Sequence, residues 1–232
     1  MRTRGVFITG TDTGVGKTWA SVAWISCGVE RGLRVGAMKP VATGATRGVR
    51  GEWQHEDVIR LQQVINLEET GGEINPYCFE PPISPNIAAR QAGREIRLEA
   101  IRECARRLEE RADLVVVEGV GGWRTPLSEQ ESVADLARIL DYPVILVVGL
   151  RLGCINQGRL SAETIARDGL PCLGWIGNGL DPGLDEPEEV IATLRRSLPV
   201  PCLGILPYVS TPDFARLAQA LQEGFDGLAG RP

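Results

Sequence analysis

Short apolar runs alternate with amphipathic stretches along the whole chain. The apolar runs predict β-strands at Val6–Ile8, Val35–Val41, Leu114–Val117, Val144–Val148, Leu173–Ile176 and Cys202–Leu206. The stretches between them predict helices at 17–31, 55–65, 85–92, 97–110, 132–140, 157–168, 187–197 and 213–226. Near-continuous apolar strands separated by helices are typical of strands buried on both faces. The pattern therefore predicts an α/β fold with a mostly parallel sheet and helices on both faces.

Length and charge narrow the possible functions. The 232 residues are enough for one α/β domain, and we expect a single domain over 1–232. The formal net charge of -5 argues against nucleic-acid binding, because no basic excess exists to neutralise phosphates. No apolar run approaches the ~20 residues of a membrane-spanning helix, so we expect no membrane partner. Six cysteines without a Cys-x-x-Cys pair, and a chain that enters its first strand at once, favour a cytoplasmic protein.

A glycine-rich segment, Gly10-Thr-Asp-Thr-Gly-Val-Gly-Lys-Thr18, separates the first predicted strand from the first predicted helix. This order is that of a phosphate-binding P-loop, in which backbone N–H groups and a helix N-terminus converge on an anion. Lys17 then reaches the β- and γ-phosphates, and the Thr18 hydroxyl ligates Mg²⁺. The strict motif has glycine where Thr11 stands, and Gly10 comes one residue early. The alternative is an ordinary strand–turn–helix with a chance Gly-Lys-Thr.

Lysine is scarce in this chain. Of 25 lysines and arginines, only Lys17 and Lys39 are lysines. Where arginine serves as the general surface cation, a retained lysine indicates a need for a compact ammonium group. Lys39 follows the second predicted strand, at the sheet edge that also carries the P-loop, and Thr43 comes shortly after it. We therefore expect Lys39 in the functional site.

Other candidate side chains also follow predicted strands. Glu118 ends the third strand and Asp57 opens a helix; with Thr18 they supply three hard oxygens that suit Mg²⁺. The alternatives are a helix-start charge for Asp57 and a solvent-exposed carboxylate for Glu118. The helix start at 153–156 either binds a carboxylate or is unoccupied, and Asn178 either reads a purine edge or occupies a turn. The proline-dense segment 75–85 is a surface crossover or the wall of a small-molecule site.

Taken together, these motifs resemble the dethiobiotin synthetase family, from about Gly5 to residue 215 in collinear order. The resemblance rests on Gly10–Thr18, Lys39-Pro-Val-Ala-Thr-Gly44, Asn75-Pro-Tyr, Ser84-Pro, Val117-Glu-Gly-Val-Gly-Gly-Trp123, Thr125-Pro-Leu127 and Val147-Val-Gly-Leu-Arg-Leu-Gly-Cys-Ile-Asn156. The early Gly10 is what this family's phosphate loop looks like. The resemblance implies a P-loop NTPase-like fold.

It also implies an ATP- and Mg²⁺-dependent cyclo-ligase of biotin synthesis. In that reaction 7,8-diaminononanoate captures CO₂, supplied from bicarbonate, as a carbamate. The carbamate attacks the γ-phosphate to give a carbamic–phosphoric anhydride, and the second amine closes the ring. The products are dethiobiotin, ADP and phosphate. Both steps build negative charge on oxygen atoms, which fixed cations stabilise without a protein nucleophile.

Carried over residue by residue, the resemblance implies roles for individual side chains. Lys39, Lys17 and Thr13 would act in catalysis, and Thr43 would bind substrate where relatives often have serine. Gly153, Cys154, Ile155 and Asn156 would bind the substrate carboxylate of the neighbouring subunit, which implies a homodimer with sites at the subunit interface. Thr18, Asp57 and Glu118 would ligate Mg²⁺. The nucleotide would contact Gly14, Val15, Gly16, Lys17, Thr18, Asp57, Glu118, Gly119, Val120, Gly121, Asn178, Pro207, Tyr208, Val209 and Asp213. Gly14 stands where some relatives have an acid, and the spacing before Asp213 shifts by one residue.

Other classes of protein share the P-loop: small-molecule kinases would leave Lys39-Pro and Leu-Gly-Cys-Ile-Asn unexplained, and signalling GTPases have an Asn-Lys-x-Asp that this chain lacks. A switch ATPase of the partitioning or division-site type generally carries a second lysine at the start of the loop, and Gly10-Thr-Asp-Thr has none. Ligases of the same superfamily that act on corrin side chains are usually longer and carry a further glutamine-hydrolysing domain. The sequence favours the dethiobiotin synthetase interpretation over all of these classes.

Overall fold

The computed structural model describes residues 5–48, 51–68, 71–209, 211 and 213–229. Its central feature is a six-stranded sheet in the order β10-β9-β8-β1-β7-β2, in which every strand pair is parallel. This confirms the predicted α/β class. The strands are β1 Gly5–Gly10, β2 Val35–Met38, β7 Leu114–Glu118, β8 Val144–Leu150, β9 Cys172–Gly179 and β10 Cys202–Leu206.

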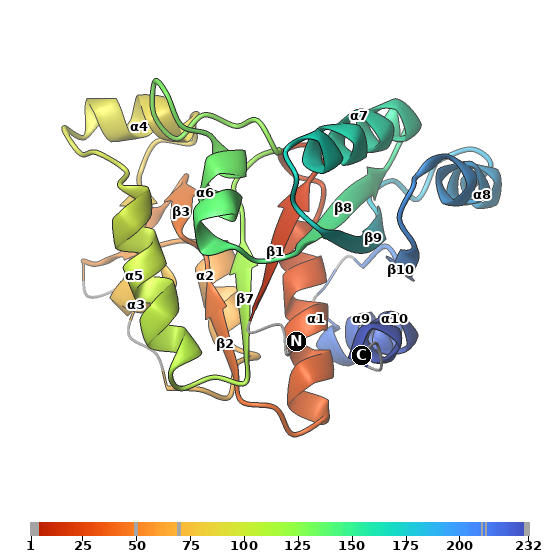
Figure 1. The fold of residues 1–232 in the computed structure, drawn as a ribbon, viewed down its shortest axis with the longest axis horizontal. Helices are drawn as coiled ribbons and strands as arrows, with labels where there is room; N and C mark the ends of the chain where they lie inside the picture. Colours follow the sequence, from red (N-terminus) through yellow and green to blue (C-terminus); the bar gives the residue numbers. More distant parts are fainter. Residues whose placement is uncertain (1–4, 49–50, 69–70, 210, 212, 230–232) are drawn as a thin grey trace.

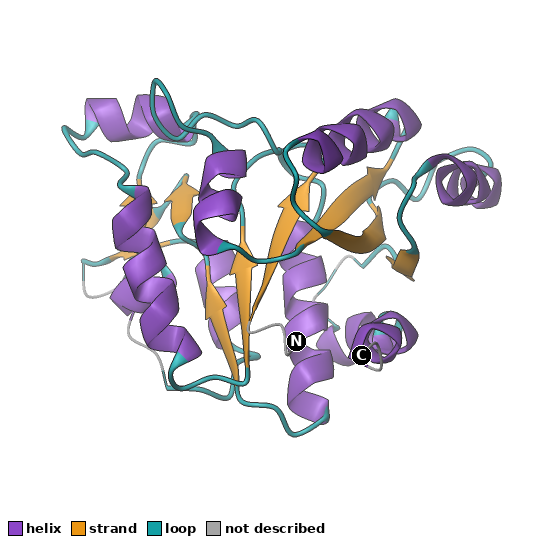
Figure 2. Cartoon of the chain, viewed as in Figure 1, coloured by secondary structure: helices purple, strands orange, loops and turns teal. Residues whose placement is uncertain are grey.

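Helices cover both faces of this sheet (Figures 1 and 2). One face packs against α1 Lys17–Glu30, α2 Glu56–Gln62, α9 Phe214–Gln219 and α10 Gln222–Ala229. The other packs against α4 Pro85–Gln91, α5 Leu98–Glu109, α6 Val133–Leu140, α7 Cys154–Arg167 and α8 Pro187–Ser197. None of the described helices combines the length and the apolar composition needed to cross a membrane.

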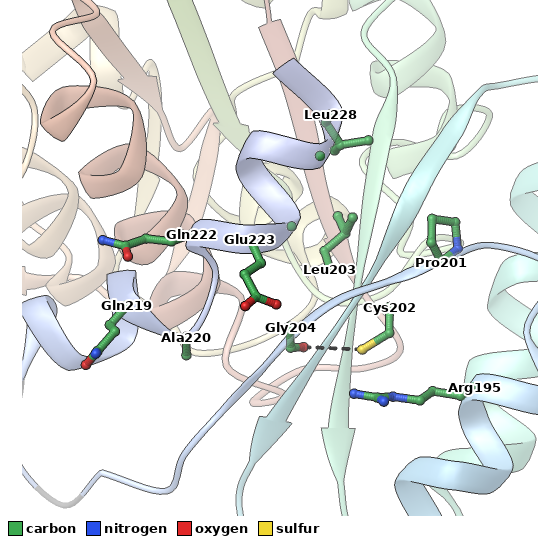
Figure 3. Close-up of a pocket in the computed structure, with 12 residues that line it drawn as sticks. Arg195, Pro201, Cys202, Leu203, Gly204, Gln219, Ala220, Gln222, Glu223 and Leu228 are labelled. Atoms are coloured by element: carbon green, nitrogen blue, oxygen red, sulfur yellow. Dashed lines mark hydrogen bonds between the residues drawn. The ribbon is translucent and has the colours of Figure 1, made fainter. Parts of the chain in front are cut away.

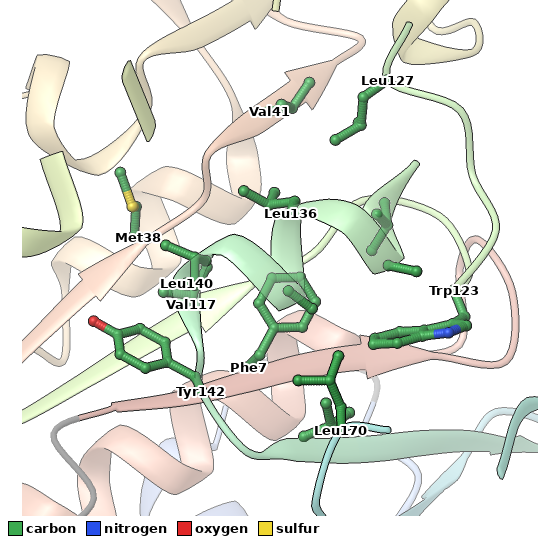
Figure 4. Close-up of a cluster of buried hydrophobic side chains, with 14 of the residues drawn as sticks. Phe7, Met38, Val41, Val117, Trp123, Leu127, Leu136, Leu140, Tyr142 and Leu170 are labelled. Carbon is green, nitrogen blue, oxygen red and sulfur yellow. The ribbon is translucent and has the colours of Figure 1, made fainter. Parts of the chain in front are cut away.

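The hydrophobic core divides into two clusters because successive strand residues point to opposite faces. In β1, Val6 and Ile8 belong to the cluster under α1, whereas Phe7 belongs to the cluster under α6. Figure 4 shows this second cluster, with Phe7 at its centre and the Trp123 ring edge-on to it, the ring centroids 6.4 Å apart. The Trp123 Nε1–H donates to Asp168 at 2.7 Å, so this buried indole has a polar partner.

The predicted strand over Val35–Val41 is wrong beyond Met38. Pro40 lacks an N–H and cannot continue a central strand. The chain leaves the main sheet there, and β3 Val41–Thr43 pairs instead with β6 Tyr77–Phe79 in a separate parallel pair. The proline-dense segment 75–85 thus contributes β6 to this second sheet and no strand to the main one.

Several boundaries also differ from the expectations. The segment between the predicted strand and the helix predicted at 55–65 contains a hairpin of β4 Thr46–Arg47 and β5 Trp53–Gln54, and neither this hairpin nor the short helix α3 Gly71–Ile74 was predicted. The helix expected over 213–226 breaks into α9 and α10, where the Leu221 N–H bonds the Ala218 carbonyl in a tight turn. The helix expected at 157–168 begins three residues earlier, at Cys154.

Candidate active site

The ends of β1, β2 and β7 meet at one edge of the sheet because these neighbouring strands are parallel. A cavity of about 310 Å³ opens there. Of the predicted residues, the structure brings together around it Thr13, Gly14, Gly16, Lys17, Thr18, Lys39, Thr43, Asp57, Glu118, Val120 and Gly121. Ligands of open parallel sheets collect at this edge, so the cavity is the candidate active site.

The backbone of the P-loop depends on two glycines. Gly16 caps α1 with φ +89°, and a Cβ there would lie 2.0 Å from the Asn178 amide nitrogen. No other residue fits that position without strain or displacement. Gly10 allows a close approach, since its Cβ would lie 2.6 Å from Val15 Cγ2. The glycine that comes one residue early therefore makes room for Val15.

Lys39 is buried between two carboxylates. Its Nζ lies 2.8 Å from Asp57 Oδ2 and 2.5 Å from Glu118 Oε1, and it donates to the Gly119 carbonyl at 3.2 Å. Burial acts to lower the pKa of Lys39, but the charges of Glu118 and Asp57 outweigh it and the net direction is upward. Burial acts to raise the pKa of Asp57, yet Lys39 brings it down to about 2. Lys39 is thus held as a cation in the cavity.

Lys17 has a different environment. Its Nζ donates to the carbonyl oxygens of Asp12 at 2.9 Å and Gly121 at 2.7 Å, and to no carboxylate. Burial and the nearby positive charge of Lys39 lower the pKa of Lys17 to about 8. The carboxylates of Glu118, Asp57 and Asp12 act in the opposite direction but do not outweigh burial, and a bound phosphate oxygen would add a direct anionic partner for Lys17.

The three predicted magnesium ligands fit a hard cation. Thr18 Oγ1 donates to Glu118 Oε1 at 2.9 Å, and Lys39 Nζ contacts Glu118 Oε1 and Asp57 Oδ2, so the three oxygens surround one small volume. Glu118 is fully buried, and its Oε2 has no hydrogen-bond partner among the described residues. An unpaired buried carboxylate oxygen is costly unless a cation satisfies it, so this donor set suits Mg²⁺.

The structure adds four residues to the cavity wall that the sequence did not assign to it: Trp19, Ala42, His55 and Arg60. The Thr43 carbonyl lies 3.1 Å from His55 Nε2 and can only accept, so Nε2 carries the proton. His55 Nδ1 then accepts the Asp57 N–H at 3.2 Å and caps α2. The available signal was position alone, the only histidine standing two residues before Asp57.

The predicted adenine contacts lie along a neighbouring part of the edge and do not line the cavity. Asn178, near the end of β9, is buried and donates through Nδ2 to the Val15 carbonyl at 3.2 Å. Pro207–Val209 follow β10, and a Cβ on Gly179 would come within 2.8 Å of the Tyr208 nitrogen, so the two strand ends are adjacent. Tyr208 is half exposed. Asp213 caps α9 by accepting the Arg216 N–H at 3.1 Å.

The segment Gly153–Asn156 forms the start of α7 and contributes nothing to the cavity wall. Leu152 beside it is 95% exposed. Arg151, one residue further back, pairs with Asp12 of the P-loop at 2.8 Å. The structure therefore links the α7 start to the P-loop but does not bring it into the cavity of the same chain.

A second cavity, of about 620 Å³, lies between β10, α8 and α10 (Figure 3). Arg195, Cys202 and Glu223 are among the residues that line it. Its described lining includes none of the predicted site residues. The larger cavity is therefore separate from the candidate active site.

Comparisons with known proteins agree with the P-loop interpretation. The family model described as "AAA domain" matches residues 4–215. The ATP-dependent dethiobiotin synthetase BioD of Xanthomonas oryzae pv. oryzae is 45% identical over 96% of this chain and 99% of its own length. The protein of the same name from Xylella fastidiosa is 46% identical over 90% of this chain and 92% of its own. The protein of that name from Aromatoleum aromaticum is 43% identical over 94% of this chain and 97% of its own length.

Solved structures show the fold alone, because their sequences are distant. The MinC:MinD cell division protein complex of Aquifex aeolicus matches with TM-score 0.62 at 15% identity, covering 99% of this chain and 97% of that one. The septum site-determining protein MinD of Pyrococcus horikoshii, complexed with Mg-ADP, gives TM-score 0.60 at 16% identity, covering 98% and 97%. Both have the P-loop NTPase fold, whereas the three sequence relatives named above are synthetases that match nearly the full length of the chain. The chain therefore belongs to the dethiobiotin synthetase family of P-loop ATP-dependent ligases.

Proposed function

We propose that this protein is a dethiobiotin synthase, which uses ATP and CO₂ to close the ring of 7,8-diaminononanoate and releases dethiobiotin, ADP and phosphate. The observation that carries the proposal is the buried pairing of Lys39 with Asp57 and Glu118, beside the P-loop of a chain 45% identical to named synthetases. The near full-length match also supports one ligase domain over 1–232. Its six cysteines are free thiols, which supports a reducing compartment such as the cytoplasm.

In this proposal the cavity stabilises negative charge at two places. Lys17 holds the β- and γ-phosphates, and Lys39 faces the carbamate oxygen that attacks phosphorus. The hydroxyls of Thr13 and Thr43 hydrogen-bond the reacting groups. Thr18, Asp57 and Glu118 would hold Mg²⁺, which neutralises phosphate charge when bound. The protein supplies position and charge, and the second amine of the substrate supplies the nucleophile for ring closure.

The substrate carboxylate is assigned to the partner subunit of a homodimer. Gly153–Asn156 lie outside their own chain's cavity, and exposed leucine side chains directly before this segment, at Leu152, and one helical turn after it, at Leu160, favour a covered interface. In this arrangement each α7 start would bind the carboxylate of the diamine in the other subunit's site.

The test is a reaction with labelled bicarbonate, Mg²⁺-ATP and 7,8-diaminononanoate, run beside Lys39→Ala. We expect labelled dethiobiotin that depends on the diamine and is largely lost in the variant. ATP hydrolysis at one rate with and without diamine, with no label in product, would contradict the proposal. A switch ATPase would then be the better interpretation.

A further inference from the structure

Arg60 and Trp19 form a stacked pair on the cavity wall. The Arg60 guanidinium lies over the Trp19 ring, 4.2 Å from its centroid. Trp19 directly follows the predicted magnesium ligand Thr18 on α1, and Arg60 lies one helical turn after the predicted ligand Asp57 on α2. The pair therefore flanks the proposed metal site on two different helices, and both side chains line the cavity.

Most N–H groups of the Arg60 guanidinium make no described hydrogen bond. Its one hydrogen bond among the described residues runs from Nη2 to Glu56, whose side chain is 72% exposed. A guanidinium has five N–H donors, so most of those of Arg60 have no protein partner in the described structure. Stacking on Trp19 fixes the plane of the group and reduces the entropy lost when it binds a ligand.

Arg60 also sets the charge of the cavity. Lys17 and Lys39 are matched in number by Asp57 and Glu118. Arg60 is the remaining cation among the described lining residues. A planar fork of donors beside a phosphate-binding loop is suited to phosphate oxygens.

The order along α1 indicates which phosphates Arg60 reaches. Lys17 is directed to the Asp12 and Gly121 carbonyls, and a P-loop lysine serves the β- and γ-phosphates. Trp19 comes after Thr18, so the stacked pair borders the cavity beyond the lysine. We propose that Arg60, positioned by Trp19, binds the α- and β-phosphates of the nucleotide. This inference rests on the proposed nucleotide site and deepens it.

The experiment measures binding of Mg-ADP and of adenosine by calorimetry, so that it needs neither the diamine nor turnover. In Arg60→Met we expect ADP affinity to fall about tenfold, because a charge-assisted contact is lost, while adenosine affinity stays unchanged. Trp19→Ala should approach the same loss, Trp19→Phe should restore part of it, and the double variant should add little. Should Arg60→Met fail to fold, Arg60→Gln carries the same expectation.

A matched control is Arg47→Met. Arg47 stacks on Trp53 at 4.0 Å in the β4–β5 hairpin, outside the described cavity lining, and its loss should leave ADP affinity unchanged. Unchanged ADP affinity in Arg60→Met would overturn the inference, as would a wild-type chain that binds no Mg-ADP. An equal loss for ADP and adenosine would also overturn it, because the stack would then only join α1 to α2. If Arg60→Met loses ADP affinity but the wild-type chain forms no dethiobiotin, the ligase proposal falls and the phosphate contact stands.

Discussion

Two groups of strand ends lie along the same edge of the sheet and are built differently. The charged strand ends, those of β1, β2 and β7, bring Lys17, Lys39 and Glu118 into one buried cluster. The neutral strand ends, those of β9 and β10, offer the uncharged side chains of Asn178 and Tyr208. Asn178 Nδ2 donates to the Val15 carbonyl of the P-loop, which links the two groups. In the proposed function, the charge of the first group acts in the chemistry, and the shape and hydrogen bonds of the second group select the base.

The largest effect should come from removing the buried cation of the charged strand ends. Lys39→Met leaves Asp57 and Glu118 facing each other without compensation. We expect the free energy of unfolding, measured by urea titration in EDTA, to fall by about 3–5 kcal/mol. Product formation should fall about 10²–10³-fold.

Mg²⁺ should return part of that stability, because a divalent cation can take the place of the ammonium group between the two carboxylates. The control is Arg34→Met, which breaks an exposed ion pair with Asp113 and should change the free energy of unfolding by less than about 1 kcal/mol. A Lys39→Met protein as stable as wild type in EDTA would contradict the picture of two carboxylates held by one lysine.

The next largest effect should come from the contact between the two groups, where Gly16 of the P-loop faces Asn178 of β9. Gly16→Ala places a Cβ at φ +89° and 2.0 Å from the Asn178 amide nitrogen. We expect the free energy of unfolding to fall by about 2–4 kcal/mol from backbone strain and overlap together. Combining it with Asn178→Ala removes the overlap and leaves the strain, so thermal unfolding of the double variant should recover part of the loss. If the double variant showed no recovery, overlap between the Cβ added in Gly16→Ala and the Asn178 amide would not be a cause of the lost stability.

The charged strand ends were predictable from the sequence for a physical reason. Each candidate side chain directly follows an apolar strand or opens a helix, and parallel strands bring such positions to one edge. Lys39 was identified because lysine is rare in this chain. Arg60 could not be identified in the same way, since arginine is the common cation here and its partner Trp19 is far away in sequence.

The errors in the fold prediction also occur where contacts between distant segments are involved. The apolar pattern of Val35–Val41 continues through Pro40, so periodicity alone did not show that Val41 pairs with Tyr77 in another sheet. At the break between α9 and α10 the chain packs closely on β10, since a Cβ on Gly204 would lie 2.4 Å from the Ala220 carbonyl oxygen. Both features involve contacts between segments distant in the sequence, which a local pattern does not report.

A moderate effect should follow from changing the neutral strand ends alone. Asn178→Asp replaces a buried donor by a carboxylate that faces the Val15 carbonyl, an acceptor. We expect it to lower the free energy of unfolding by about 1–3 kcal/mol, and more than Asn178→Ala does.

In Asn178→Ala, ATP should lose its advantage over GTP in competition binding, with the affinity for inorganic phosphate unchanged. Unaltered base discrimination would remove the adenine assignment from Asn178.

The smallest effect on stability should come from Arg151, which follows β8 and pairs with Asp12 of the P-loop. Its ion pair with Asp12 is 2.8 Å long, with side chains 40% and 47% exposed, so Arg151→Ala should change the free energy of unfolding by less than about 1 kcal/mol. Yet Asp12 also accepts the Thr13 N–H at 2.7 Å, and Arg151 stands two residues before Gly153. If the α7 start serves the diamine, the variant should raise KM for the diamine several-fold while KM for ATP changes little. Equal changes in both would mean that the pair supports the P-loop alone, and that substrate binding by Gly153–Asn156 is independent of it.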